Sequence, residues 1–314
     1  MKLIILFLNF LICFSNILEN IRKEIVDKAL LYLPKRETEN ILKMATEMSK
    51  AREQYSMSEG EVAYFVYKWV AQNIEIDCRE DENIIEPYIT YREGKGKELG
   101  ILSLYDTMCG LLSIESHIVN GLIKYRTSNK TKLIDNKEYA WSSVLIDNNY
   151  YLLDLMMGFG YCYKNEFTRT LSRVDSYFGI LPEESIRYRF PNDNKWQLLS
   201  KPITFEEFKH QGILESGFFK FFKTISPDVQ TFTEKTFKIK LTFDKPIGPL
   251  NSDDVVVFND NLDGVHTPAL FFIYDLKVSD GACEFSFQPT TGYIDFALMI
   301  NSTYYPIATY EVYN

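Results

Sequence analysis

The chain has 314 residues and a formal net charge of −9, from 43 acidic and 34 basic side chains. This length is enough for one large domain or two modest ones. The acidic balance argues against a general nucleic-acid-binding protein, because such proteins neutralise phosphates with basic surfaces. The 21 Tyr and 23 Phe residues are typical of aromatic-rich cores and strands.

The first 15 residues, MKLIILFLNFLICFS, combine a lysine, an unbroken apolar core and a small residue at its end. This pattern predicts a secretory signal peptide with cleavage near Ser15 or Asn16. The apolar run is too short for a comfortable membrane span, and no later run reaches spanning length. We therefore expect a protein of the secreted or endomembrane-lumenal class with no membrane span.

Four cysteines follow this segment: Cys78, Cys109, Cys162 and Cys283. An oxidising compartment allows up to two disulfides among them. Cys109 lies inside a helical apolar pattern, which favours a free core thiol, and Cys283 lies in a later, strand-rich region. Cys78 and Cys162 both lie in loops that follow core elements, so they are the disulfide pair that we suggest.

The sequence has few other candidate modification or metal-binding sites. Sequons begin at Asn129 and Asn301, and both are candidate glycosylation sites in a secreted chain. Only three histidines occur and no two cysteines form a C-x-x-C motif, which argues against a zinc site. We predict no metal and no cofactor.

Helical patterns dominate the first hundred residues. Residues of about 20 to 57 alternate charged and apolar residues as packing helices do, and Ser58-Glu59-Gly60-Glu61 has the form of a capping box for the helix that follows. Residues 79–97 are charged and are predicted to be an irregular loop over the mouth of a cleft. Glu98 then begins an apolar helical pattern that continues to about Leu112 and predicts a central, buried helix.

The stretch from Tyr139 to Gly160 predicts two strands joined by a tight turn at Asp147-Asn148-Asn149. Asp154 directly follows the second strand in an otherwise apolar run. A carboxylate there is costly to bury unless it has a partner. Pattern alone favours an aspartate that caps the turn.

The two stretches together resemble a transglutaminase-like, or papain-like, domain. In that family a His-Ala-Trp-Asn motif carries the catalytic histidine on one strand, and an Asp on the next strand orients it. Ala140, Trp141 and Asp154 match this pattern, whereas Tyr139 stands at the histidine position. The helical stretch from Glu98 matches the family's nucleophile segment without a gap at Gly100, Leu104, Tyr105, Met108, Cys109, Ile114 and Gly121.

This register puts Glu98 at the position of the nucleophilic cysteine. The family's chemistry needs a thiolate activated by an imidazole and a helix N-terminus. A carboxylate is a poor nucleophile at an amide, and a phenol with a pKa near 10 is no base at neutral pH. The resemblance therefore implies a degenerate triad, Glu98, Tyr139 and Asp154, with Trp141 in the cleft.

The resemblance is more specific after Gly160. Tyr177-Phe178-Gly179-Ile180-Leu181-Pro182-Glu183, then Arg189-Phe190-Pro191 and Trp196-Gln197-Leu198-Leu199, are similar to the tail of the kyphoscoliosis-peptidase type. Arg189 departs from a histidine in that pattern. From about residue 226 the pattern changes to alternation, as in Phe237, Ile239, Leu241 and Phe243. Several short strands with regular turns predict a β-sandwich.

The sequence thus predicts an α+β fold in which a transglutaminase-like domain over 16–210 precedes an all-β immunoglobulin-like sandwich over 226–314. The first functional hypothesis is an inactive relative that binds a protein or peptide and no nucleic acid. The alternative is an active acyltransferase or peptidase with a non-standard site, for instance through acid–base chemistry of Glu98 and Asp154. A third is a purely structural surface protein, and the oligomeric state stays open.

Overall fold

The computed structural model describes residues 17–34, 40–79, 85–125, 134–229, 231–232, 236–244, 254–260, 266–267, 273–288, 292–300 and 303–312. The predicted signal peptide and the sequon residues Asn129 and Asn301 lie outside these ranges. Tertiary contacts divide the chain into two compact units, Met1–Ile118 with Trp141–Leu181 and Val119–Ala140 with Pro182–Asn314. The second unit therefore takes in 119–140 and 182–210, which the sequence assigns to the first domain.

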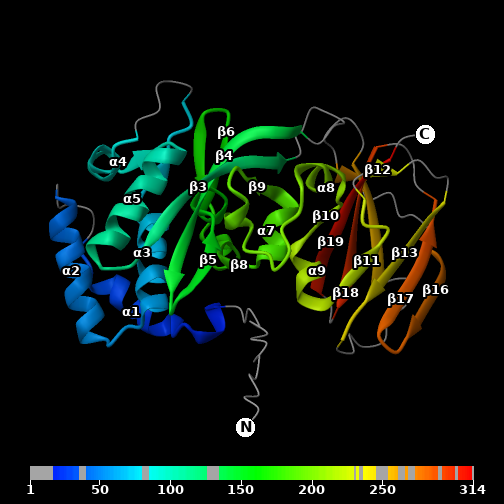
Figure 1. Ribbon diagram of the computed structural model, residues 1–314, viewed down its shortest axis with the longest axis horizontal. Coiled ribbons are helices and arrows are strands. Elements are labelled where there is room, and N and C mark those ends of the chain that lie inside the picture. Colours follow the sequence, from blue (N-terminus) through cyan, green and yellow to red (C-terminus); the bar gives the residue numbers. More distant parts are fainter. Residues whose placement is uncertain are drawn as a thin grey trace, which may run out of the picture. The chain divides into compact units, whose positions relative to one another are not determined.

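The first unit is rich in helices, and its long helix α3 packs against both α1 and α5 (Figure 1). Eleven of the 15 residues of α3 and seven of the 14 residues of α5 are buried, as expected for helices that pack against the core. The helical elements of this unit are η1 (Ile17–Asn20), α1 (Lys23–Tyr32), α2 (Ile41–Gln54), α3 (Glu59–Asn73), α4 (Pro87–Glu93), α5 (Glu98–Leu111), α6 (Leu155–Phe159) and η2 (Leu171–Tyr177).

The start of α3 carries the predicted capping box. The Ser58 hydroxyl accepts from the Glu61 amide at 3.3 Å, and the Glu61 carboxylate accepts from the Ser58 amide at 2.9 Å. Arg22 donates from Nε and Nη2 to the two Glu61 oxygens at 2.6 and 2.7 Å. Burial raises the pKa of Glu61, but the hydrogen bonds from Arg22 and Ser58 outweigh it and lower this pKa to about 2.

The charged stretch before Glu98 is more regular than expected. Residues 79–97 contain α4 and the short strand β2 (Lys95–Gly96), which pairs in parallel with β1 (Glu75–Ile76). Pro87 stands at the start of α4, where its fixed φ suits a helix. Gly94 ends α4 in the left-handed region at a φ of 70°. The prediction of an irregular loop was wrong here because the charges obscured a helix framed by proline and glycine.

A five-stranded sheet has the strand order β8-β5-β4-β3-β9. The predicted hairpin forms within it: β4 and β5 are antiparallel, with Val144 opposite Tyr151, and the turn residues Asp147 and Asn148 have φ values of 49° and 63°. Positive φ at both positions matches a turn that suits the twist of a hairpin. The strands are β3 (Ser116–Tyr125), β4 (Ile134–Ile146), β5 (Asn149–Leu153), β8 (Phe178–Ile180) and β9 (Arg189–Pro191).

The first described residue, Ile17, is part of the core. Its side chain is 5% exposed and lies against Gly60 and Gly179. A Cβ atom on Gly179 would lie 2.2 Å from Ile17 Cγ2, and Gly179 has a φ of +70°. Both the space and the backbone conformation therefore require glycine at this position.

The second unit contains two further sheets whose buried residues form one hydrophobic core. One sheet has the order β10-β19-β18-β14-β15, with β12 beside β19, and the other has the order β11-β13-β17-β16. The predicted alternation holds in β13, where Phe237, Ile239 and Leu241 are buried between exposed lysines. The strands are β10 (Ile213–Leu214), β11 (Thr224–Ser226), β12 (Thr231–Phe232), β13 (Phe237–Thr242), β14 (Val255–Asp260), β15 (His266–Thr267), β16 (Tyr274–Ser279), β17 (Ala282–Phe287), β18 (Gly292–Ile300) and β19 (Thr303–Val312).

Residues 182–226 of this unit are also ordered. They form α7 (Pro182–Tyr188), η3 (Asn194–Gln197), α8 (Phe205–His210), β10, α9 (Ser216–Phe221) and β11. Because β10 pairs with β19, with Ile213 opposite Thr309, the segment between the two predicted domains is part of a sheet and not a free linker.

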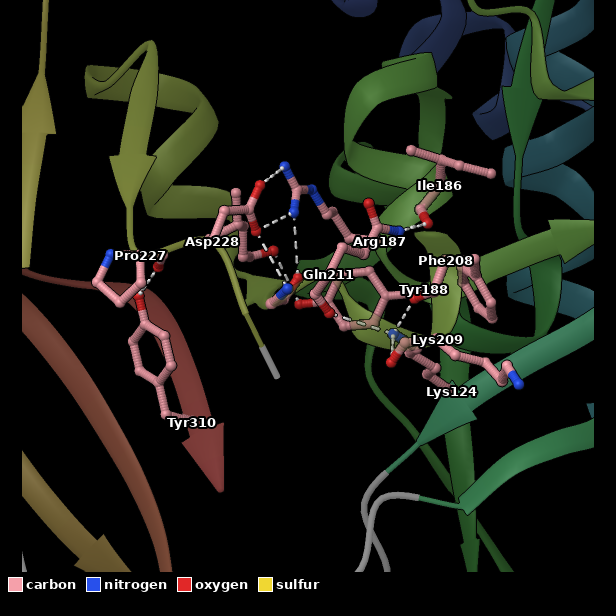
Figure 2. A network of polar contacts seen from close by, with 12 residues as sticks. Lys124, Ile186, Arg187, Tyr188, Phe208, Lys209, Gln211, Pro227, Asp228 and Tyr310 are labelled. Carbon is pink, nitrogen blue, oxygen red and sulfur yellow. Dashed lines mark hydrogen bonds and ion pairs between the residues drawn. The ribbon is translucent and has the colours of Figure 1, made fainter. Parts of the chain in front are cut away.

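Polar contacts hold this segment in place (Figure 2). Arg187 of α7 forms a two-point ion pair with Asp228, at 2.5 and 2.8 Å, and Asp228 also accepts from the Gly212 amide at 3.1 Å. Tyr188 donates to the Leu214 carbonyl at 3.1 Å, and Tyr310 donates to the Pro227 carbonyl at 3.0 Å. We call these contacts the Arg187 junction.

Lys124 of β3 is a buried cation in the same view (Figure 2). Its ammonium group donates to the Phe208 carbonyl, and to the carbonyls of Lys209 and Gln211 at 3.2 Å each. It also lies 4.5 Å from the centre of the Phe208 ring. The ammonium therefore satisfies carbonyls that the end of α8 leaves without helical partners.

Candidate functional site

Glu98 is the first residue of α5, as the sequence predicts. Its backbone follows Lys97, the N-cap, whose side chain makes no capping hydrogen bond. The Glu98 side chain is half-buried, whereas Gly100, Ile101 and Leu102 behind it are buried. A carboxylate at this end of a helix is stabilised by the helix dipole, so the glutamate suits the position electrostatically.

Asp154 directly follows β5 and is fully buried. Its carboxylate accepts from the Met157 amide at 2.9 Å and so caps α6, while its own amide donates to the Tyr177 carbonyl at 2.9 Å. The Tyr67 hydroxyl donates to the Asp154 carbonyl at 3.3 Å. Burial, together with the negative charge of Asp154, raises the pKa of Tyr67 well above its ordinary value. The aspartate therefore has the capping role that the pattern alone favours.

Tyr139 lies on β4 and is 9% exposed. Glu98 and Asp154 belong to the first unit, whereas Tyr139 belongs to the 119–140 part of the second. The convergence of these three side chains in one cleft stays a prediction from the resemblance.

The residues after Tyr139 combine burial with unmet hydrogen-bonding capacity. In the described part of the chain, four buried side-chain polar atoms have no hydrogen-bond partner. Three of them are Trp141 Nε1, Ser142 Oγ and Ser143 Oγ, and the fourth is Thr90 Oγ1. Trp141 and Ser143 point to one face of β4 and Ser142 to the other, since side chains alternate along a strand. Buried polar atoms are nearly always paired in folded proteins, so three such atoms in consecutive residues mark this part of β4 as unusual.

The sequence directs attention to Trp141 but not to Ser143, because a single serine in a strand carries no signal. Ser142 is opposite Leu153 and Ser143 is opposite Leu152. The two serines therefore pair with the last two residues of β5, which directly precede Asp154. The resemblance alone identifies Ser142, as the residue in place of the family's asparagine.

Neither free thiol in the described residues is activated. Cys109 of α5 is buried, and burial raises the pKa of its thiol to about 12. Cys283 of β17 is buried as well, and burial raises its pKa to about 11. A nucleophilic cysteine needs the opposite shift, because the thiolate is the reactive form.

Cys78 and Cys162 are joined in a disulfide, the pair suggested by the sequence. Their Cα atoms are 5.6 Å apart, an ordinary separation for such a bond. The disulfide links the loop after β1 to β6 (Gly160–Tyr163), which forms a separate hairpin with β7 (Glu166–Arg169).

Within the ranges that the structure describes, no group of three or more His, Cys, Asp or Glu side chains has the arrangement of a metal site. The same ranges contain no helix of the length and apolarity that a membrane crossing requires.

Sequence comparison finds curated relatives over about half of the chain, and two of these relatives are kyphoscoliosis peptidases. The chain is 25% identical over 161 residues to that of Homo sapiens and 24% identical over 161 residues to that of Mus musculus. Each match covers 49% of this chain and 24% of the relative, so the chain matches about a quarter of the length of these curated proteins.

Other comparisons add little. No family model matches the chain. Among solved structures, a crystal structure of a TGase is 14% identical, with a TM-score of 0.29, and the match covers 42% of this chain and 34% of that one. A score of this size does not define a shared fold, so the relationship stands on the sequence match.

Proposed function

We propose that the chain is a secreted, catalytically inactive relative of the transglutaminase-like proteins, which binds a protein or peptide segment without cleaving or crosslinking it. The binding site is the degenerate triad Glu98, Tyr139 and Asp154, with Trp141 in the cleft. The strands after residue 226 form an immunoglobulin-like sandwich in this proposal. The chain needs no cofactor for this role.

One observation carries the proposal: the residue at the beginning of α5 is Glu98 and not a cysteine. Acyl transfer of this type needs a thiolate at a helix N-terminus next to an imidazole. Burial raises the pKa of the thiols of Cys109 and Cys283, so neither is suited to replace the missing nucleophile. Tyr139, at the histidine position, has no basic nitrogen to accept a proton.

The polar atoms of residues 141–143 in β4 bear on binding. An indole N–H and two hydroxyls are buried there without partners, so they keep hydrogen-bonding capacity for ordered water or for a ligand group that enters the site. A ligand reaches them only if the site opens, because Trp141, Ser142 and Ser143 are at most 1% exposed.

Secretion is supported by several features of the sequence and by the disulfide. Disulfides persist in oxidising compartments and are rare in the cytosol, so the Cys78–Cys162 bond agrees with the predicted signal peptide. The sequons at Asn129 and Asn301 agree with it as well.

The first experiment measures turnover of a glutamine-containing peptide, by ammonia release and by amine incorporation. We expect no turnover above background from the unmodified protein. Turnover that disappears in Glu98→Ala would make Glu98 a nucleophile or general acid and overturn the proposal in favour of an active enzyme. Turnover that persists in Glu98→Ala would place the chemistry at another site.

The second experiment tests binding with a displayed peptide library selected on the immobilised mature chain. We expect enriched peptides whose affinity falls roughly tenfold or more in Glu98→Lys, because the variant reverses the charge at the site. Glu59→Lys is the matched control, since Glu59 is likewise the first residue of a helix, α3. Equal loss in both variants, or no enrichment, would contradict a binding site at Glu98.

A further inference from the structure

The β6–β7 hairpin stands apart from the large sheets. Its two strands pair only with each other in the described sheet order, and its turn residues Lys164 and Asn165 have φ values of 49° and 65°. A two-stranded hairpin is at best marginally stable in water by itself. Other contacts of the first unit must therefore hold it.

Both strands of the hairpin are attached to the same corner, where α3 ends and β1 begins. On β6, Cys162 is bonded to Cys78, two residues after β1. On β7, Arg169 donates to the carbonyl of Ala71 and, at 3.0 Å, to that of Ile74. The guanidinium thus satisfies carbonyls at the end of α3, and we call the disulfide and Arg169 together the hairpin clamp.

The same corner holds the chain that leads to Glu98. The Glu75 amide donates to the Gly94 carbonyl at 2.9 Å, and the Asp77 amide donates to the Gly96 carbonyl at 2.8 Å. Asp77 precedes Cys78, and only Lys97 separates Gly96 from Glu98. The disulfide is therefore connected to the start of α5 in three steps. Cys78 is bonded to Asp77, the Asp77 amide donates to Gly96, and Gly96 is two residues before Glu98.

The space around Gly96 leaves no room for a side chain at this position. A Cβ atom on Gly96 would lie 2.7 Å from Thr90 Cγ2, so β2 is packed tightly against α4. The first turn of α5 thus depends on the placement of β2, and β2 depends on β1 and on the clamp.

The disulfide is also open to reagents. Cys162 is exposed and Cys78 is half-buried, whereas Cys109 and Cys283 are buried. A dithiol added to the folded protein would give two electrons and two protons to the bond, leaving Cys78 and Cys162 as thiols and the reagent as its own disulfide.

We infer that the hairpin clamp is a redox-dependent positioning device for the Glu98 end of α5. Reduction of Cys78–Cys162 loosens β2 and the first turn of α5 before it opens the rest of the first unit. The inference rests on the proposed function only in so far as Glu98 belongs to the binding site. Local opening of this kind is set by the few contacts of the segment and not by the stability of the whole unit.

The test is hydrogen exchange followed by mass spectrometry on the mature chain, with and without dithiothreitol. Alkylation of both Cys78 and Cys162 verifies that the bond is reduced. We expect peptides over 94–101 to exchange roughly tenfold faster or more after reduction, at short labelling times when α3 is still protected. Cys283→Ser is the matched control and should respond as the unmodified protein does.

Two outcomes would overturn the inference. Unchanged exchange over 94–101 in the reduced protein would show that the clamp does not position α5, and an equal rise in α3 would show that the disulfide acts on the whole unit. Arg169→Met with the disulfide intact should raise exchange over 94–101 by a smaller factor. Because exchange is measured without a ligand, failure here is distinguishable from failure of the proposed binding function.

Discussion

The hairpin clamp of the first unit and the Arg187 junction of the second attach distant segments by different chemistry. The clamp combines a disulfide with a guanidinium on helix carbonyls. The Arg187 junction uses an ion pair and hydrogen bonds, with the buried Lys124 ammonium next to it. The first attachment includes a covalent bond that a reductant can break, whereas the second consists only of ionic and hydrogen-bonding contacts.

This difference shows how each unit secures backbone groups that its helices leave unpaired. Arg169 serves the end of α3, and Lys124 serves the end of α8. In both places a cation meets carbonyls at the negative end of a helix, where it is favoured. Only in the first unit is the contact reinforced by a covalent bond, so the two units should respond differently to reductant.

The largest expected effect comes from removing the covalent bond. Cys78→Ser with Cys162→Ser should lower the free energy of unfolding by about 2–5 kcal/mol, the usual cost of losing a native disulfide. Denaturant unfolding measures this loss. Dithiothreitol should produce a similar loss in the unmodified protein and none in the double variant. A reduced and fully alkylated protein with an unchanged midpoint would contradict the prediction.

Lys124→Met probes the second attachment with an unbranched, uncharged side chain that is one atom shorter. The carbonyls of Phe208, Lys209 and Gln211 would then lose a charged donor in a buried place, at a cost of about 2–3 kcal/mol. Lys209→Met is the control, because its ammonium pairs with Glu206 at the surface and should contribute little. Equal effects in the two variants would mean that burial of the ammonium has no special role.

Tyr139→Phe tests the predicted contact of the degenerate triad. We predict that the Tyr139 hydroxyl donates to the buried Asp154 carboxylate, so its removal takes one donor away from a buried acceptor and should cost on the order of 1–3 kcal/mol. The exposed Tyr161→Phe serves as the control in the same thermal or denaturant unfolding experiment. If Tyr139→Phe is as stable as the unmodified protein, the Tyr139 hydroxyl does not donate a stabilising hydrogen bond to Asp154.

The smallest effects concern pH, and they have opposite signs in the two units. Burial and Glu215 raise the pKa of Glu184 from 4.5 to about 7 despite Arg189, so the folded state holds a proton that the unfolded state releases. This contribution to stability should fall as pH rises from 4.5 to 7. Glu61, with a pKa of about 2, contributes above pH 4.5 and loses this contribution as pH falls towards 2.

Two variants test separately how stability depends on pH above and below pH 4.5. Glu184→Gln should flatten the dependence of the unfolding midpoint between pH 4.5 and 7, and Glu61→Gln should flatten it below pH 4.5. If Glu184→Gln leaves the slope above pH 4.5 as it was, the carboxyl does not titrate in the folded protein as described.

Local patterns identified several of these elements from the sequence. The capping box at Ser58, the start of α5 at Glu98 and the hairpin around Asp147 depend on residues close together in the chain, and each is found where it was predicted. Asp154 caps α6 through residues only three positions away, so its local role was visible too.

Other features depend on contacts between distant residues and had no local signal. Arg169 binds carbonyls 95 and 98 positions away, and Lys124 binds carbonyls 84 to 87 positions away. The pairing of β10 with β19 likewise joins the segment around Ile213 to the end of the chain. Backbone carbonyls are present at every residue, so a sequence cannot show which of them a cation will find. By contrast, α4 has local signals in Pro87 and Gly94, which the many charged residues around them obscure.

The packing of Ile17 against Gly179 has a consequence for proteolytic trimming of the N-terminus. If the leader is removed at Ser15 or Asn16, as its sequence predicts, the new end of the chain lies next to a side chain of the core. An aminopeptidase that trims past Asn16 would then remove Ile17 and leave a gap beside Gly179, which has no side chain of its own to fill it. A chain shortened in this way should unfold more readily than one that keeps Ile17, because the buried side chain is lost.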